Sequence, residues 1–169
     1  MTGTGSAAMI IRPAVAGDES AIARIITPVI RAGETYALPT SWTEAEALAY
    51  WGSPGHTIFV ADDGAVVGTY YIRPNQRAGG GGDHVANCAF MTAASATGRG
   101  VATAMCGHAL QYAATAGYRA MQFNFVVSTN ARAVALWQRF GFEIAGRLPG
   151  AFRHPTLGCV DALVMYREL

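Results

Sequence analysis

The sequence is short of charge, of long apolar runs and of cysteines at metal-binding spacing. Only 14% of its residues are charged and the net charge is +1, so no basic face is available for nucleic acid. No apolar run is long enough to span a bilayer, and the N-terminus lacks the charged and apolar regions of a secretion signal. Cys88, Cys106 and Cys159 are odd in number and lack metal spacing. We therefore predict a cytoplasmic protein with reduced thiols, no metal, no membrane partner and no nucleic-acid partner.

What the sequence does contain is enough apolar material for a full core. It has 169 residues, of which 51% are hydrophobic, and this length favours one domain over two. Residues 1–8 are small and polar, and we expect them to form a disordered tail. The sequence therefore predicts a single domain over residues 9–169.

The N-terminal third reads as a strand followed by two helices. Residues 9–14 are typical of an edge strand, and a helix should begin near Asp18, with Pro28 kinking or splitting it. A second helix should begin near Thr43, because Thr43 and Glu46 have the spacing of a capping box.

Two further segments predict an antiparallel pair and a closing strand. Residues 57–75 form two β-rich runs around Asp63-Gly64, the dipeptide that suits a tight hairpin turn. The glycine run at 79–82 is either a lid over the active site or a plain flexible connection. After Phe142 we expect a strand, a Pro- and Gly-rich loop, and a closing strand at 160–165.

The stretch from His84 to Phe142 carries the chemistry. It begins with a short apolar strand at 84–92, after which Gly98 and Gly100 precede a long alanine-rich helix. A second strand, apolar on both faces, leads to a helix that begins at Asn130 and stops at Gly141. The first turn of a helix has unpaired N–H groups and the positive end of the helix dipole, and glycines let phosphate oxygens approach it closely. The glycine turn therefore predicts an anion site.

Two motifs in this stretch resemble those of a known family. Asn130, Ala133, Leu136, Trp137, Gly141 and Phe142 fit the signature NxxAxxLYxxxGF, with Trp in place of Tyr. The turn TGRGVA at 97–102 is similar to the pyrophosphate loop [Q/R]xxGx[G/A], with Thr97 in place of Arg or Gln. Both motifs occur in the expected order, in strand and helix context, and together they resemble the Gcn5-related N-acetyltransferases (GNAT), which use acetyl-CoA.

This resemblance implies a fold and a cofactor site. The fold would be α/β, a mixed sheet with helices on both faces, whose two central strands splay apart after a bulge near Phe90 and Met91. Acetyl-CoA would lie in the gap, and a backbone N–H at Phe90 or Met91 would polarise its thioester carbonyl. The predicted cofactor-binding residues are Phe90, Met91, Thr92, Thr97, Gly98, Arg99, Gly100, Val101, Ala102, Thr103, Asn130 and Trp137.

The sequence offers few residues for the two proton transfers of the reaction, which are removal of a proton from the ammonium and protonation of the leaving thiolate. An alkylammonium must lose a proton before it attacks, yet the central strand lacks the Glu that many members carry, leaving Asp83 and His84 at its start. The indole of Trp137 cannot donate a proton to the leaving thiolate. We name His84 and Asn124 as catalytic candidates. Cys88, inside the strand, is either a nucleophile or a packing residue.

Two polar residues in apolar strands are candidates to bind the acceptor, the amine that receives the acetyl group. Asn87 and Asn124 each need a hydrogen-bond partner, so they either brace the splayed strands or hold the acceptor. Their spacing to Asn130 is similar to that in a branch that acetylates proline analogues such as azetidine-2-carboxylate. The resemblance also places Tyr36 and Trp42 on the acceptor wall, although both rings could simply seal the core.

Neutral asparagines suit a small zwitterion better than a polycation. Arg147, Arg153 and His154 could receive a carboxylate or the cofactor's phosphates, or belong to a solvated loop. The sequence therefore predicts an N-acetyltransferase for a small-molecule amine, with an amino or imino acid as the candidate acceptor, and leaves a homodimer open. Two alternatives stay open: a peptide or protein N-acetyltransferase, which needs an open groove, and a non-catalytic acyl-CoA sensor.

Overall fold

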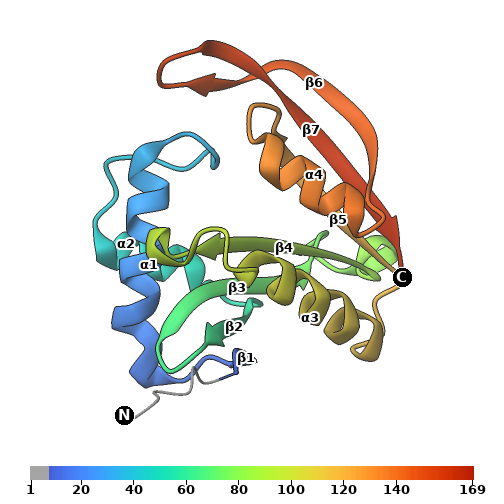
Figure 1. Cartoon of the computed structure of the whole chain (residues 1–169). Coiled ribbons are helices and arrows are strands. Elements are labelled where there is room, and N and C mark those ends of the chain that lie inside the picture. Colours follow the sequence, from blue (N-terminus) through green and yellow to red (C-terminus); the bar gives the residue numbers. More distant parts are fainter. Residues whose placement is uncertain (1–7) are drawn as a thin grey trace.

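The protein folds around one seven-stranded sheet, as the computed structural model, which describes residues 8–169, shows (Figure 1). The strand order is β1-β2-β3-β4-β5-β7-β6. The strands are β1 Ile10–Pro13, β2 Thr57–Asp62, β3 Val66–Pro74, β4 Val85–Thr92, β5 Ala120–Val127, β6 Glu143–His154 and β7 Gly158–Glu168. The helices are α1 Glu19–Ala32, α2 Glu44–Trp51, α3 Val101–Thr115 and α4 Ala131–Arg139. The predicted α/β class with a mixed sheet is confirmed.

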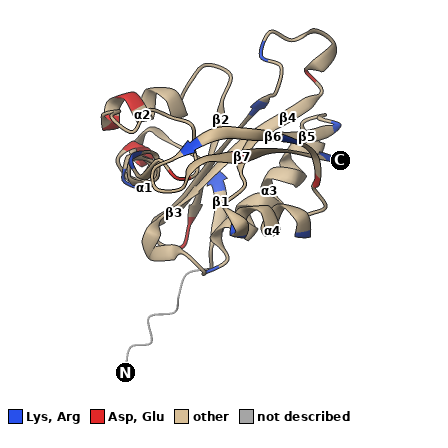
Figure 2. Ribbon diagram, turned by 90° about the horizontal axis from the view of Figure 1, so that it is seen from above, with Lys and Arg blue, Asp and Glu red and all other residues tan. Residues whose placement is uncertain are grey.

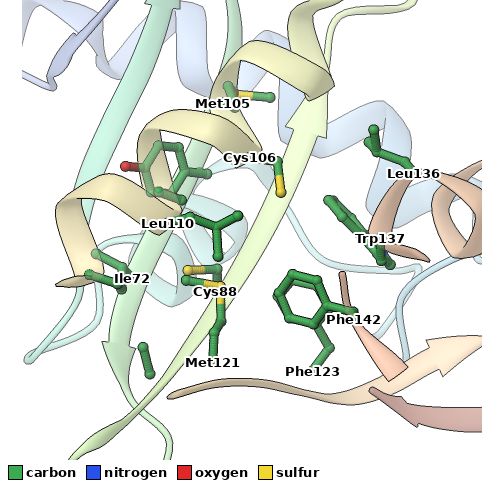
Figure 3. Packing of buried hydrophobic residues seen from close by; sticks show 14 of the residues in the cluster. Ile72, Cys88, Met105, Cys106, Leu110, Met121, Phe123, Leu136, Trp137 and Phe142 are labelled. Atoms are coloured by element: carbon green, nitrogen blue, oxygen red, sulfur yellow. The ribbon is translucent and has the colours of Figure 1, made fainter. Parts of the chain in front are cut away.

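Helices cover both faces of the sheet. Figure 2 shows α1 and α2 on one side and α3 and α4 on the other. On the α3 and α4 side, side chains from both helices and from β3, β4 and β5 meet in one core (Figure 3). A second core under α1 and α2 is built around Ile26, Ile30 and Trp51. The apolar sides of the two helix pairs therefore face the sheet from opposite sides.

Local signals placed most helix ends. Thr43 caps α2: its Oγ1 accepts from Glu46 N–H (3.2 Å), and the Glu46 carboxylate accepts from Thr43 N–H (2.8 Å), which confirms the capping box. The helix expected at Asp18 is also confirmed. Pro28, however, lies inside a continuous α1 and does not split it. Packing of Ile26 and Ile30 against the sheet stabilises the helix on both sides of the proline, which offsets the lost hydrogen bond.

The central strands splay apart, as predicted. β4 and β5 run parallel, but they pair only at Val85 with Ala120 and at Ala86 with Met121. The position expected for the bulge is corrected. β4 pairs with β3 without a register shift from Ala86 to Thr92, so no irregularity falls at Phe90 or Met91. The shift lies in β5, between Phe123 and Val126, where β5 has one residue more than β7.

The C-terminal segment is a long hairpin rather than a strand and a loop. β6 runs through Pro149 and Gly150, which we expected in a loop, and β7 extends well beyond 160–165 at both ends. A register shift between Leu148 and Phe152 accommodates these residues. Since β6 is an edge strand, a proline there removes no ladder bond that the sheet needs.

The structure bears on the predicted N-terminal tail and on membrane spans only within residues 8–169. The predicted tail, residues 1–8, lies outside the described residues except for Ala8. Within residues 8–169, no helix has both the length and the hydropathy to cross a membrane.

Candidate active site

The splayed strands leave backbone groups of β4 facing the gap. Ala93 N–H donates to Val67 O (2.8 Å) at the end of the β3–β4 ladder. Hydrogen-bonded and non-hydrogen-bonded pairs alternate along an antiparallel ladder, so Met91 bonds to β3 while the N–H and C=O of Phe90 point away from it. Of the two residues that the sequence left open, Phe90 is therefore the one that offers an N–H in the gap.

Tyr36 holds the gap-facing groups of Phe90. Its hydroxyl donates to Phe90 O (2.7 Å) and accepts from Phe90 N–H (3.1 Å), although the two residues lie 54 positions apart. Burial raises the pKa of the Tyr36 phenol well above its usual range, so the hydroxyl stays protonated. The predicted place of Tyr36 at the active site agrees with this geometry. Tyr36 contacts the Phe90 N–H, the backbone group predicted to polarise the thioester carbonyl.

A cavity of about 340 Å³ lies beside Phe90, between the α1–α2 loop and the splayed strands. Tyr36, Asn87 and Asn124, three of the residues predicted to bind the acceptor, line it. Trp42 does not line it; its ring packs on Tyr50 with centroids 5.4 Å apart, and Tyr50 faces the cavity instead. We call this space the acceptor cavity.

An amide network spans the acceptor cavity. Asn87 is 7% exposed and donates to Gln122 O (2.9 Å), so its side chain bridges β4 and β5 just beyond their last backbone pair. Asn124 donates to the Asn75 Oδ1 (2.7 Å) and accepts from the Gln122 Nε2 (2.9 Å). Asn87 therefore braces the splayed strands, and Asn124 is oriented by two amide partners at the cavity wall.

A second cavity begins at the glycine turn before α3. Gly98 (φ 80°) and Gly100 (φ 79°) have left-handed backbones, and a Cβ at either position would meet no atom within 4 Å. No acidic residue lies in the first turn of α3, Val101–Thr103, and no side chain caps it. The turn is therefore open and suits the diphosphate of a nucleotide cofactor. Its predicted residues line the cavity: Thr97, Gly98, Gly100, Val101, Ala102 and Thr103.

The two cavities are adjacent and share part of their walls. Phe90, Thr92, Asn130 and Trp137 line both. Trp137 is 8% exposed and packs against the rings of Phe90 (5.1 Å between centroids) and Phe123 (4.9 Å). Asn130 caps α4 by accepting from Ala133 N–H (3.4 Å). Met91 lines the acceptor cavity only. A ligand with its diphosphate at Gly98 can thus extend past Trp137 to Phe90.

Two predicted residues lie elsewhere. Arg99 forms an ion pair with Asp63, and its N–H donates to Ala96 O (3.2 Å), so neither group faces the second cavity. His84 is exposed and lies before β4, where its carbonyl accepts from Arg119 N–H (2.8 Å). It lines neither cavity because β4 enters the sheet at the closed end of the β4–β5 pair.

The C-terminal basic residues and the glycine run also lie outside both cavities. Arg147 pairs with Asp161 (2.7 Å), which also accepts from Gly150 N–H, so it holds the irregular part of β6. His154 accepts from Thr156 N–H at the β6–β7 turn, and Arg153 is exposed. The run at 79–82 precedes β4 and gives no contact to support the lid hypothesis.

The structure favours packing over a nucleophilic role for Cys88, although this residue is among those that line the acceptor cavity. Its side chain belongs to the core under α3 (Figure 3) and is 7% exposed. Burial raises the pKa of the Cys88 thiol well above its usual range, so the nucleophilic thiolate is disfavoured. The alternative of a cysteine nucleophile therefore has no support. Residues 8–169 contain no group of three or more His, Cys, Asp or Glu side chains placed to hold a metal ion.

Sequence reasoning missed several residues that line the cavities, five of which carry a phenol or a guanidinium. Tyr50, Tyr71 and Arg73 line the acceptor cavity, and Arg132 and Arg139 line the second. The two α4 arginines are seven residues apart and so share a helix face, a signal present in the sequence. Tyr71 and Arg73 alternate along β3 with core residues, but nothing local indicates that their face opens into a cavity.

Comparisons with known proteins identify the family of this chain. The family model described as the acetyltransferase (GNAT) family matches residues 27–142. A GCN5-related N-acetyltransferase from Kribbella flavida is 42% identical, with a TM-score of 0.89 over 96% of this chain and 98% of that one. A GNAT superfamily phosphinothricin acetyltransferase from Sinorhizobium meliloti, solved in complex with AcCoA, is 23% identical, with a TM-score of 0.82 over 95% of this chain and 88% of that one.

Among curated proteins, N-acetyltransferase aca1 of Schizosaccharomyces pombe is 31% identical over 101 residues. The match spans 59% of this chain and 47% of that protein, so it covers about half the length of the relative. The splayed strands, the glycine turn before α3 and the match over residues 27–142 lead to one conclusion: this chain belongs to the acetyltransferase (GNAT) family.

Proposed function

We propose that this acetyltransferase transfers the acetyl group of acetyl-CoA to the amine of a small molecule, with amino and imino acids as the favoured acceptors. The observation that carries the proposal is the acceptor cavity, whose 340 Å³ falls at the lower end of the range for small-molecule pockets. Its amides and tyrosines can hold a compact polar molecule.

The residues of the glycine turn hold the cofactor's diphosphate. The N–H groups of Gly98, Gly100, Val101, Ala102 and Thr103 donate to it, and glycine at positions 98 and 100 leaves room for phosphate oxygens. Thr97 lacks the longer N–H-bearing side chain of the usual Arg or Gln, a loss of one charge-assisted hydrogen bond to the phosphate at most, about 1.5–3 kcal/mol. Arg132 and Arg139 lie on the same cavity and supply positive charge from α4.

Phe90 N–H polarises the thioester carbonyl, and Tyr36 controls access to it. Because the Tyr36 hydroxyl occupies this N–H, a carbonyl oxygen must replace that hydroxyl as the acceptor. Negative charge then grows on an oxygen that faces a fixed donor in a mostly apolar gap. The displaced Tyr36 hydroxyl stays protonated and can donate a hydrogen bond to the leaving thiolate, whose proton comes from the ammonium that forms when the amine attacks.

A thiol-release assay tests the proposal. Acetyl-CoA is incubated with the twenty proteinogenic amino acids, azetidine-2-carboxylate, simple alkylamines and short peptides, and free CoA is measured. Release with small amines supports the proposal. Release with peptides alone would replace it with a peptide acetyltransferase, and acetyl-CoA binding without release would replace it with a sensor. The cytoplasmic location and a homodimer stay predictions.

A further inference from the structure

We propose that Arg73 binds a carboxylate of the acceptor and so restricts the enzyme to acceptors that carry both an amine and a carboxylate. The inference rests on the proposed function, since it concerns the same cavity. Arg73 is the only charged residue among the described residues that line the acceptor cavity. A cavity with a cation and without a carboxylate repels diamines and polyamines and attracts an anion.

The guanidinium of Arg73 is fixed but not neutralised. Its Nη1 donates to the carbonyl oxygens of Pro74 (2.9 Å) and Asn75 (3.2 Å). Within residues 8–169 Arg73 makes no salt bridge, and Nε and Nη2 have no hydrogen-bond acceptor. Three N–H donors of a half-buried arginine are therefore available. The two oxygens of a carboxylate match the spacing of Nε and Nη2, and each can accept one of two parallel charged hydrogen bonds from them.

The neighbours of Arg73 suit the rest of an amino acid. Arg73 and Asn87 are direct partners in the β3–β4 ladder, so their side chains lie on the same face of the sheet. The backbone of Asn75, which holds the guanidinium, belongs to the residue whose side chain orients Asn124. The cation thus shares a sheet face with Asn87, which braces the strands, and is held by the residue that orients Asn124, whose amide can receive a further polar atom of the acceptor.

Binding the carboxylate at Arg73 also helps the amine to react. In a free amino acid, the carboxylate stabilises the neighbouring ammonium and keeps it protonated. Pairing that carboxylate with Arg73 offsets this stabilisation, and no Asp or Glu among the described lining residues restores it. The pKa of the bound amine therefore falls, and a larger fraction is neutral. His84 lines neither cavity and the central strand carries no Glu, so no general base is evident. The lowered pKa of the bound amine reduces the need for one.

The test compares each acid with its amide. The rate of CoA release is measured for each amino acid of the panel, and for azetidine-2-carboxylate, against the corresponding carboxamide, with the native protein and with Arg73→Gln. We expect the native protein to prefer the acids. In Arg73→Gln, kcat/KM for the acids should fall roughly 10- to 100-fold while that for the carboxamides changes little, because a charged hydrogen-bond pair is lost.

Two controls separate this inference from a folding defect and from the proposed function. Arg153→Gln removes an exposed arginine outside both cavities and should leave the acid-to-amide ratio unchanged. Acetyl-CoA binding by calorimetry should be the same in all three proteins. Equal turnover of acids and carboxamides, with a ratio unmoved by Arg73→Gln, would overturn the role of Arg73 and leave the small-molecule function standing. No release with any acid, amide or amine would overturn the proposed function itself.

Discussion

Gly68 of β3 lies where α3 comes closest to the sheet, and its replacement by alanine should disturb both stability and cofactor binding. A Cβ at this position would lie 2.7 Å from Val101 Cγ1 and 3.0 Å from Met105 Cε, well inside van der Waals contact. Both neighbours are almost fully buried, at 2% and 0% exposure. β3 is paired on both sides, so the strand cannot move away. The added methyl group must therefore push the first turn of α3 outward.

The magnitude follows from two opposing effects. Overpacking a core position costs about 1–3 kcal/mol, whereas replacing glycine by alanine restricts the unfolded chain and returns about 0.4–1 kcal/mol. The free energy of unfolding should therefore fall by up to roughly 2.6 kcal/mol, with a mid-range value of about 1.3 kcal/mol that lowers Tm by a few degrees in a chain of this length, at about 2–4 °C per kcal/mol. Val101 is the first residue of α3 and follows the glycine turn at which we propose the diphosphate binds. Acetyl-CoA should therefore also bind more weakly.

Thermal denaturation followed by circular dichroism and calorimetric titration with acetyl-CoA measure these effects. Gly146→Ala, in β6, is the matched control, because a Cβ there meets no atom within 4 Å and the backbone φ is not positive. Adding Val101→Ala to Gly68→Ala removes the clashing methyl group and should recover part of the loss that the two single changes predict. If Gly68→Ala melts with Gly146→Ala and binds acetyl-CoA equally well, the close approach of α3 does not control the site.

Three further changes test other contacts. Tyr36→Phe leaves Phe90 N–H without its acceptor, so acetyl-CoA no longer displaces a hydroxyl; calorimetry should show binding tighter by about 1 kcal/mol, and weaker binding would contradict this. Asn124→Ala should lower kcat/KM for the acceptor roughly 10- to 100-fold with acetyl-CoA affinity kept, and unchanged turnover would remove Asn124 from the site. Hydrogen bonds from Arg12 lower the pKa of Asp18 in the folded protein. The Asp18 carboxylate therefore stabilises the fold above the unfolded pKa of about 3.9, and this contribution is lost as pH falls further. In Asp18→Asn, the free energy of unfolding from urea denaturation should decline less steeply below that pH.

Local chemistry was readable in the sequence because it depends on a few neighbouring residues. The capping box of Thr43 and Glu46, the turn at Gly64 and the open helix start at Gly98 and Gly100 are each set by backbone preferences within a few positions. Local rules failed where the surroundings overrode them. Pro28 sits in an unbroken helix that packs on the sheet, and Pro149 and Gly150 sit in an edge strand that needs no inward hydrogen bond from them.

The sequence by itself determined the order of the elements, the family motifs and the glycine turn, because each is encoded in a short contiguous stretch. Only the tertiary structure decided which groups meet in the gap. The contact between Tyr36 and Phe90 joins residues 54 positions apart, and the choice of Phe90 over Met91 depends on the register of β4 against β3. Arg73 looks like any strand arginine until the splay of β4 from β5 opens a cavity beside it. Pairing and register between distant strands fix where each backbone group and side chain points, and no single stretch of sequence contains that information.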